Sequence, residues 1–167
     1  AAYRAKQKRR LYYFGTAAGI ALAGTLIGSV GMYMRSYVNS ADYRQNIEWA
    51  TRAPSTEEKI AYYSDAIGID VAEPEAYLGM IEAMEADGVF TSEEEKTLLA
   101  EIDKYPLGDG LDTNYANLAY RIGSLYWFCY AYGATDSQLA EYSTQVAVTR
   151  MKSAIPWFDY AMTYGGE

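Results

Sequence analysis

Two patterns of hydrophobic and polar positions divide this chain. Residues 11–34 form an apolar run of 24 residues without a charged side chain. A helix needs about 20 such residues to cross a bilayer, so this run is long enough. From about residue 35 onward, apolar positions recur every three or four residues, which is the period of an amphipathic helix. No stretch shows sustained strand alternation. The pattern therefore predicts an all-α protein, with one transmembrane helix followed by a helical domain.

The segment after the apolar run predicts a connecting helix over residues 35–53, which Pro54 ends. Residues 54–167 then predict a domain of helical hairpins. Two capping boxes, Ser55 to Glu58 and Thr91 to Glu94, mark helix starts.

Three further helices follow from the same signals. Pro74 begins one, and Asp87-Gly88 ends it. The two longest are expected over residues 113–132 and 138–164, the second with Pro156 inside it and either continuous or interrupted.

The flanks of residues 11–34 predict an orientation. Residues 1–10 form a basic juxtamembrane segment with five Lys or Arg residues and no acid, whereas Arg35 is the basic residue directly after the run. This asymmetry places the N-terminus in the cytoplasm and the helical domain outside the plasma membrane. A signal peptide fits less well, because its apolar core is usually 7–15 residues long.

The predicted span is rich in small residues. Gly15 and Gly19, and again Gly24 and Gly28, have the GxxxG spacing that allows two membrane helices to approach closely. This spacing favours association with a partner helix or a second copy. It is equally compatible with the ordinary glycine content of membrane helices, and the sequence leaves both interpretations open.

Charge and composition narrow the function. Residues 35–167 carry nine basic and 22 acidic side chains, a formal charge of −13, which argues against nucleic acid as a partner. The chain has no histidine, and its one cysteine, Cys129, lies among large apolar residues and is expected to be buried. Its 18 tyrosines are expected to pack amphipathic helices. With no nucleophile–base pair or metal cluster, we expect neither an enzyme nor a cofactor.

Two acidic segments look like ion sites but have simpler explanations. Asp87 to Glu94 resembles the second half of an EF-hand loop, yet Ala83 stands where the first carboxylate ligand belongs. A turn followed by a helix cap is the favoured interpretation, with a weak ion site of Asp87 and Glu94 as the alternative. Asp109 and Asp112 are expected in a solvated loop, with Asp112 or the next residue as a helix cap.

The spacing of small and large residues resembles tetratricopeptide (TPR) repeats. Tyr63 and Ala66 match the F-x-x-A pair of that family's second helix, and Tyr77 and Met80 match the W-x-x-L start of the next first helix. Val71 departs from the family's turn proline.

Two later segments extend this resemblance to roughly residues 40–164. They are Ala154-x-x-x-Phe158-x-x-Ala161 and Ile122-Gly123-x-x-Tyr126. The resemblance implies an α-solenoid that binds a protein or peptide on its first-helix surfaces. The candidate contact residues are Tyr77, Glu82, Tyr120 and Trp127, all of which are alternatively core residues.

The order of a basic segment, a span and a TPR-like domain also resembles the C-terminal half of membrane-bound bacterial Ser/Thr kinases. A kinase domain would then precede Ala1, since no kinase motif falls within the 167 residues. Three functions remain open: a membrane-anchored scaffold for protein–protein interaction, the sensor and dimerisation region of such a kinase, and a structural subunit of a membrane assembly.

Overall fold

The structure is a computed structural model that describes residues 36, 38–129 and 144–166. Contacts divide the chain into two compact units, Ala1–Ala41 and Asp42–Glu167. The first unit lies almost wholly outside the described residues, so the fold described below is that of the second.

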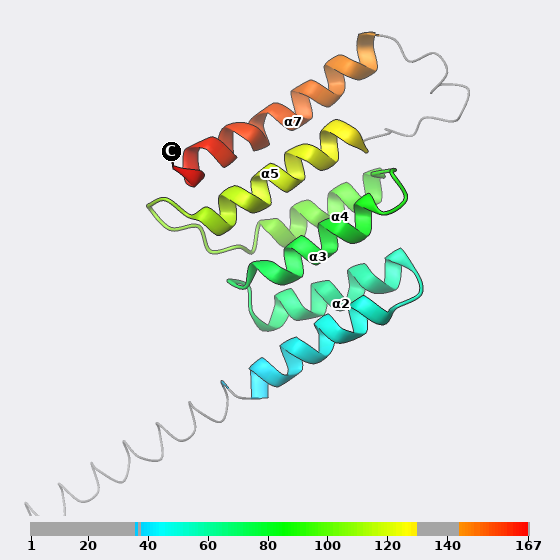
Figure 1. Cartoon of the computed structure of the whole chain (residues 1–167), viewed down its shortest axis with the longest axis vertical. Coiled ribbons are helices and arrows are strands. Elements are labelled where there is room, and N and C mark those ends of the chain that lie inside the picture. The colour runs from blue at the N-terminus through cyan, green and yellow to red at the C-terminus, as the bar shows by residue number, and fades with distance from the viewer. Residues whose placement is uncertain (1–35, 37, 130–143, 167) are drawn as a thin grey trace, which may run out of the picture. The chain divides into compact units, whose positions relative to one another are not determined.

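The described part of the second unit is all-helical, as predicted. A helix covers residues 38–52, and further helices are α2 (Thr56–Ile69), α3 (Pro74–Glu85), α4 (Ser92–Ile102), α5 (Thr113–Phe128) and α7 (Thr144–Gly165). Helix α3 packs against α2, α4 and α5, and α5 packs against α7 (Figure 1). Residues 42–52, at the end of the predicted connecting helix, belong to this unit, since the Tyr43 hydroxyl accepts a hydrogen bond from the Ala76 N–H at 3.1 Å.

Local capping starts three of these helices. Thr91 and Glu94 form the complete predicted capping box of α4. At α2, Ser55 accepts a bond from the N–H three residues on, which is one half of the predicted box. Asp112 caps α5 by accepting a bond from the Tyr115 N–H at 3.0 Å. Each cap binds an N–H that the first turn of a helix leaves without an intrahelical partner.

Helix α5 ends earlier than predicted, and α7 is continuous through Pro156. Helix α5 ends at Phe128, with Cys129 as its C-cap, and residues 130–132 lie outside the described part. The described part of the last predicted helix is α7 (Thr144–Gly165), which Pro156 does not interrupt, and residues 138–143 lie outside the described part. A proline inside a helix removes one backbone hydrogen bond and crowds the carbonyl four residues earlier, at a cost of about 3 kcal/mol. The packing of α7 against α5 offsets this cost.

Small residues allow close helix crossings, as the sequence pattern predicts. A Cβ atom at Gly123 would lie 2.7 Å from the Phe158 ring, which joins α5 to α7. Gly79 of α3 meets the Tyr63 ring of α2 in the same way. The largest fully buried side chains of the described core are Ile67, Tyr77, Met80, Ile81, Met84, Phe90, Leu98, Leu118, Ile122 and Leu125.

The predicted transmembrane helix is not among the residues that the structure describes. Residues 11–34, with Gly15, Gly19, Gly24 and Gly28, lie outside the described residues, as does the basic segment 1–10. Within the described residues, no helix is long and apolar enough to cross a membrane.

Candidate functional site

A groove lined by aromatic side chains opens where the end of α4, the connection to α5, and α7 meet. Its volume is about 570 Å³. We call it the aromatic groove. Its rings are those of Tyr105, Tyr115, Trp157, Tyr160 and Tyr164. Its aliphatic side chains are Leu99, Ala100, Ile102 and Leu107, and Asp103 lies among them.

The inner wall of the aromatic groove continues a ladder of rings that begins in the core. Tyr77 of α3 contacts Tyr105 with ring centroids 5.6 Å apart, and Tyr105 contacts Tyr115 of α5 at 5.5 Å. Tyr115 then contacts Tyr164 of α7 edge-on at 5.1 Å. Tilted and edge-on pairs are favourable arrangements of aromatic rings. The ladder therefore fixes the inner wall through three helices and one connection.

The outer wall is a stripe on α7. Trp157, Tyr160 and Tyr164 are spaced by three and four residues, so they share one helix face. The Trp157 and Tyr160 rings contact each other edge-on at 5.7 Å, and Tyr160 is 46% exposed. On the opposite side, Leu99 and Leu107 are 40% and 45% exposed. The groove thus offers apolar and aromatic surface that the other described residues of this unit leave partly exposed.

The inner tyrosines keep their protons well above neutral pH. Burial raises the pKa of Tyr105 to about 12, with a further contribution from the nearby carboxylate of Asp112. Burial also raises the pKa of Tyr115. At neutral pH the inner wall is therefore uncharged and carries phenol hydroxyls, which donate and accept hydrogen bonds.

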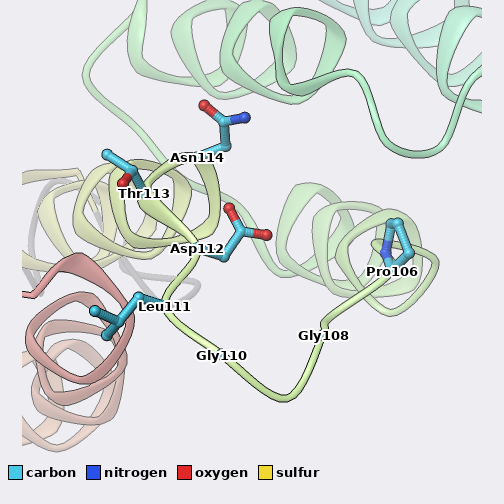
Figure 2. Close-up of a pocket in the computed structure, with 7 residues that line it drawn as sticks. All are labelled: Pro106, Gly108, Gly110, Leu111, Asp112, Thr113 and Asn114. Atoms are coloured by element: carbon cyan, nitrogen blue, oxygen red, sulfur yellow. The ribbon is translucent and has the colours of Figure 1, made fainter.

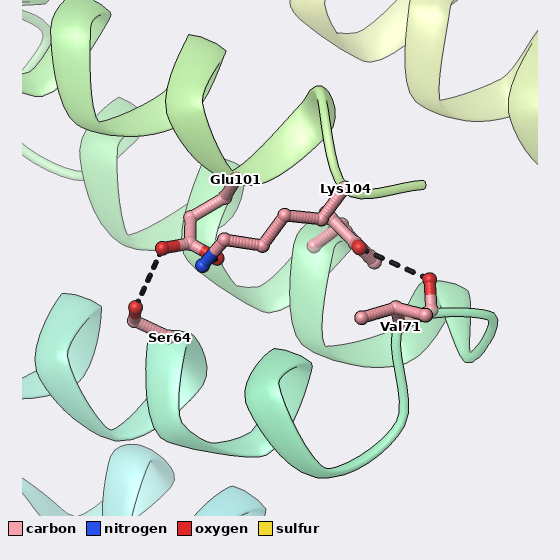
Figure 3. A network of polar contacts seen from close by, with 5 residues as sticks. Ser64, Val71, Glu101 and Lys104 are labelled. Atoms are coloured by element: carbon pink, nitrogen blue, oxygen red, sulfur yellow. Dashed lines mark hydrogen bonds and ion pairs between the residues drawn. The ribbon is translucent and has the colours of Figure 1, made fainter. Parts of the chain in front are cut away.

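A second polar feature, shown in Figure 3, lies between α2 and α4. Glu101 is the buried charged residue of the described core, at 6% exposure. It accepts a hydrogen bond from the Ser64 hydroxyl at 2.7 Å and pairs with the Lys104 Nζ at 2.6 Å. Its oxygens are thus occupied within the chain, so this network stabilises the fold rather than presenting a binding group.

The connection that begins at Pro106 and the first two residues of α5 line a smaller, open pocket of about 460 Å³ (Figure 2). Its one carboxylate is Asp112, which serves as the N-cap of α5. The Asp112 N–H bonds the Tyr164 carbonyl at 3.0 Å and ties the loop to the end of α7. Asp109 is exposed. The predicted loop with an Asp112 cap is confirmed.

The segment resembling an EF-hand is a turn followed by a cap, as favoured above. Gly88 has a φ of 75°, and Asp87 accepts a bond from the Val89 N–H at 2.9 Å. Glu94 accepts bonds from the N–H and the hydroxyl of Thr91, both at 2.8 Å. No cluster of three or more metal-ligating side chains occurs among the described residues.

The four residues predicted to contact a partner separate into two groups. Tyr77 lies in the core at 0% exposure, and its hydroxyl donates to the Val71 carbonyl at 3.0 Å, so it has no surface to offer. Glu82 on α3 is exposed, as are Tyr120 and Trp127 on α5. Their helices pack together and are joined by an ion pair of 2.6 Å between Arg121 and Glu85. Cys129 is buried, as predicted.

The sequence prediction missed the aromatic groove. Trp157-x-x-Tyr160-x-x-x-Tyr164 was visible as a stripe on one helix face. Such a stripe is equally typical of a core-facing helix, and only the neighbouring elements decide whether it is covered.

Comparison of the chain with family models, with curated proteins and with solved structures finds no match.

Proposed function

We propose that this protein is a single-pass membrane protein whose helical unit binds another protein or a peptide outside the plasma membrane. In this proposal residues 11–34 cross the membrane, and residues 1–10 remain in the cytoplasm. The apolar run and the excess of basic residues before it support this orientation.

We further propose that the helical unit is a TPR-like stack. Two observations support this. Helix α3 packs against α2, α4 and α5, and α5 packs against α7, so each of these helices lies on others that are near it in the chain, as in stacked hairpins. The glycine–aromatic crossings at Gly79 and Gly123 also fit the small-and-large spacing of the repeat.

The aromatic groove is the main observation that supports the proposed binding function. Tyrosine and tryptophan residues dominate the energy of protein interfaces, because a ring covers much apolar area and loses little conformational freedom. Here two such residues, Trp157 and Tyr160, form the outer wall of the groove, whose volume is about 570 Å³. That size is within the range of about 300–1,000 Å³ typical of ligand sites, so the groove accommodates a few side chains of a partner.

Site-specific photo-crosslinking in cells tests this function with the full chain. A benzophenone amino acid replaces Tyr160 in the aromatic groove, Tyr120 on the predicted α5 surface, or Glu57 in the exposed first turn of α2. We expect a discrete protein adduct from position 160 and none from position 57. Equal adducts at positions 160 and 57 would contradict a specific groove interaction. A stronger adduct at position 120 would move the binding surface to α5.

A second experiment tests whether the interaction depends on the predicted transmembrane helix. Gly24→Ile and Gly28→Ile enlarge the two small positions of one GxxxG pair. If the helical unit binds the partner, the adduct at position 160 survives both changes. Loss of the adduct in these variants, with the chain still in the membrane, would instead favour assembly through the span.

A further inference from the structure

The aromatic groove has a one-sided charge. Asp103 is the charged side chain among the described residues that line it, and Asp103 is exposed. It takes part in none of the ion pairs formed within the described residues. The adjacent Lys104 is held by Glu101, with Nζ 2.6 Å from Oε2. The groove therefore presents a carboxylate beside its rings, with the neighbouring lysine already neutralised.

The rings beside this carboxylate are suited to a cation. Trp157 and Tyr160 are partly exposed, and so is Tyr164, which extends the same wall. The negative face of an aromatic ring attracts an ammonium or guanidinium group within about 6 Å, most strongly for tryptophan. An arginine or lysine side chain also carries an apolar stem, which matches Leu99 and Leu107 on the opposite side.

The net charge of the whole unit also favours a cationic partner. Residues 42–167 contain all 22 acidic residues of the chain and only eight basic ones. Among the described residues, Arg52, Lys104 and Arg121 are already in ion pairs. A unit with a formal charge of −14 attracts cationic segments and repels a second copy of itself.

We infer that the aromatic groove binds a cationic segment of a partner protein, with an arginine or lysine side chain lying against Trp157 and Tyr160 and its charge facing Asp103. This inference rests on the proposed binding function and names the chemistry of the partner. An acidic segment would meet Asp103 with like charge, and a neutral segment would leave that carboxylate unused.

Calorimetric titration of the full chain in detergent tests the inference with blocked heptapeptides. The probe has a central arginine flanked by leucine and proline, and its matched peptides carry citrulline or glutamate at the centre. Citrulline keeps the shape of arginine and removes the charge. We expect the arginine peptide to bind about tenfold more tightly than the citrulline peptide, and the glutamate peptide to bind more weakly still. We expect raised salt to reduce this preference.

Variants of the chain locate the contact. Asp103→Asn should weaken the arginine peptide about three- to fivefold and leave the citrulline peptide unchanged. Tyr160→Leu keeps apolar surface but removes a ring, and should weaken the arginine peptide about fivefold. Asp65→Asn, at an exposed aspartate of α2, is the matched control and should change neither affinity.

Four results would overturn the inference. They are equal affinity for arginine and citrulline, equal effects of Asp103→Asn and Asp65→Asn, no binding of any peptide, and a concentration-dependent dimer that Tyr160→Leu abolishes. Photo-crosslinking separates this failure from that of the proposed function. A specific adduct at position 160, together with no preference for arginine, would leave a binding groove whose partner is not cationic.

Discussion

The two faces of helix α4 contain similar residues in different settings. On the inner face, Leu98 is fully buried and Glu101 is bonded to Ser64 of α2 and to Lys104. On the outer face, Leu99 is 40% exposed, and Asp103, the C-cap residue that follows α4, borders the aromatic groove. One face is thus closed by the chain itself, whereas the other presents an apolar side chain and a carboxylate to solvent. The comparison separates side chains that hold the fold from side chains available to a partner.

The largest effect is expected from adjacent leucines on the two faces. Leu98→Ala should lower the free energy of unfolding by about 2–5 kcal/mol, because it leaves a cavity in the core. Leu99→Ala should change it by less than about 0.5 kcal/mol, since that side chain borders open solvent. Urea unfolding followed by circular dichroism compares the two. Similar losses for both variants would show that the outer face is not open.

The second prediction concerns the contact between α5 and α7, which approach each other closely at Gly123. Gly123→Ala places a Cβ atom 2.7 Å from the Phe158 ring. It should therefore destabilise the unit by about 1–3 kcal/mol through overpacking. The control is Gly68→Ala in α2, where a Cβ atom meets nothing within 4 Å. That change should stabilise by up to about 1 kcal/mol through helix propensity. An unchanged midpoint for Gly123→Ala would contradict the close crossing.

The third prediction tests the buried carboxylate of the inner face. Glu101→Gln keeps an acceptor for Ser64 but removes the charge that Lys104 meets, and should cost about 1–2 kcal/mol. Glu48→Gln removes the charge of the exposed pair with Arg52, whose side chains are 60% and 71% exposed. It should cost less than about 0.5 kcal/mol. If the two variants lowered the urea midpoint of unfolding equally, burial of Glu101 would not strengthen its ion pair with Lys104.

The fourth prediction concerns the stability of the fold at alkaline pH. Burial raises the pKa of Tyr77 and of Tyr105 from 10.0 to about 12. Because the fold favours the neutral phenols, their contribution is fully present below pH 10. It decreases as the pH rises from about 10 to 12, where the unfolded chain releases protons that the fold retains.

The measurement is the urea midpoint at a series of pH values from 7 to 12. Tyr105→Phe should make the alkaline decline shallower, because phenylalanine has no proton to release. A midpoint that stays constant up to pH 12 would contradict burial of these hydroxyls.

The sequence by itself determined the local structure. The caps at Thr91 and Asp112 act over three residues, and the helical period is a property of each segment, so both were predictable without knowledge of the fold. The L-G-x-x-Y spacing also pointed to Gly123 as a small position, although the ring that it accommodates, that of Phe158, lies 35 residues further along the chain.

The tertiary structure alone decided which side chains face a partner. Tyr77 was a candidate contact residue by its motif, yet it is covered by Tyr105, 28 residues further along the chain. Tyr160 has the same periodic setting and is left half exposed, because no described element packs over that part of α7. Burial depends on contacts between segments distant in sequence, and periodicity specifies a face of a helix without specifying what covers it.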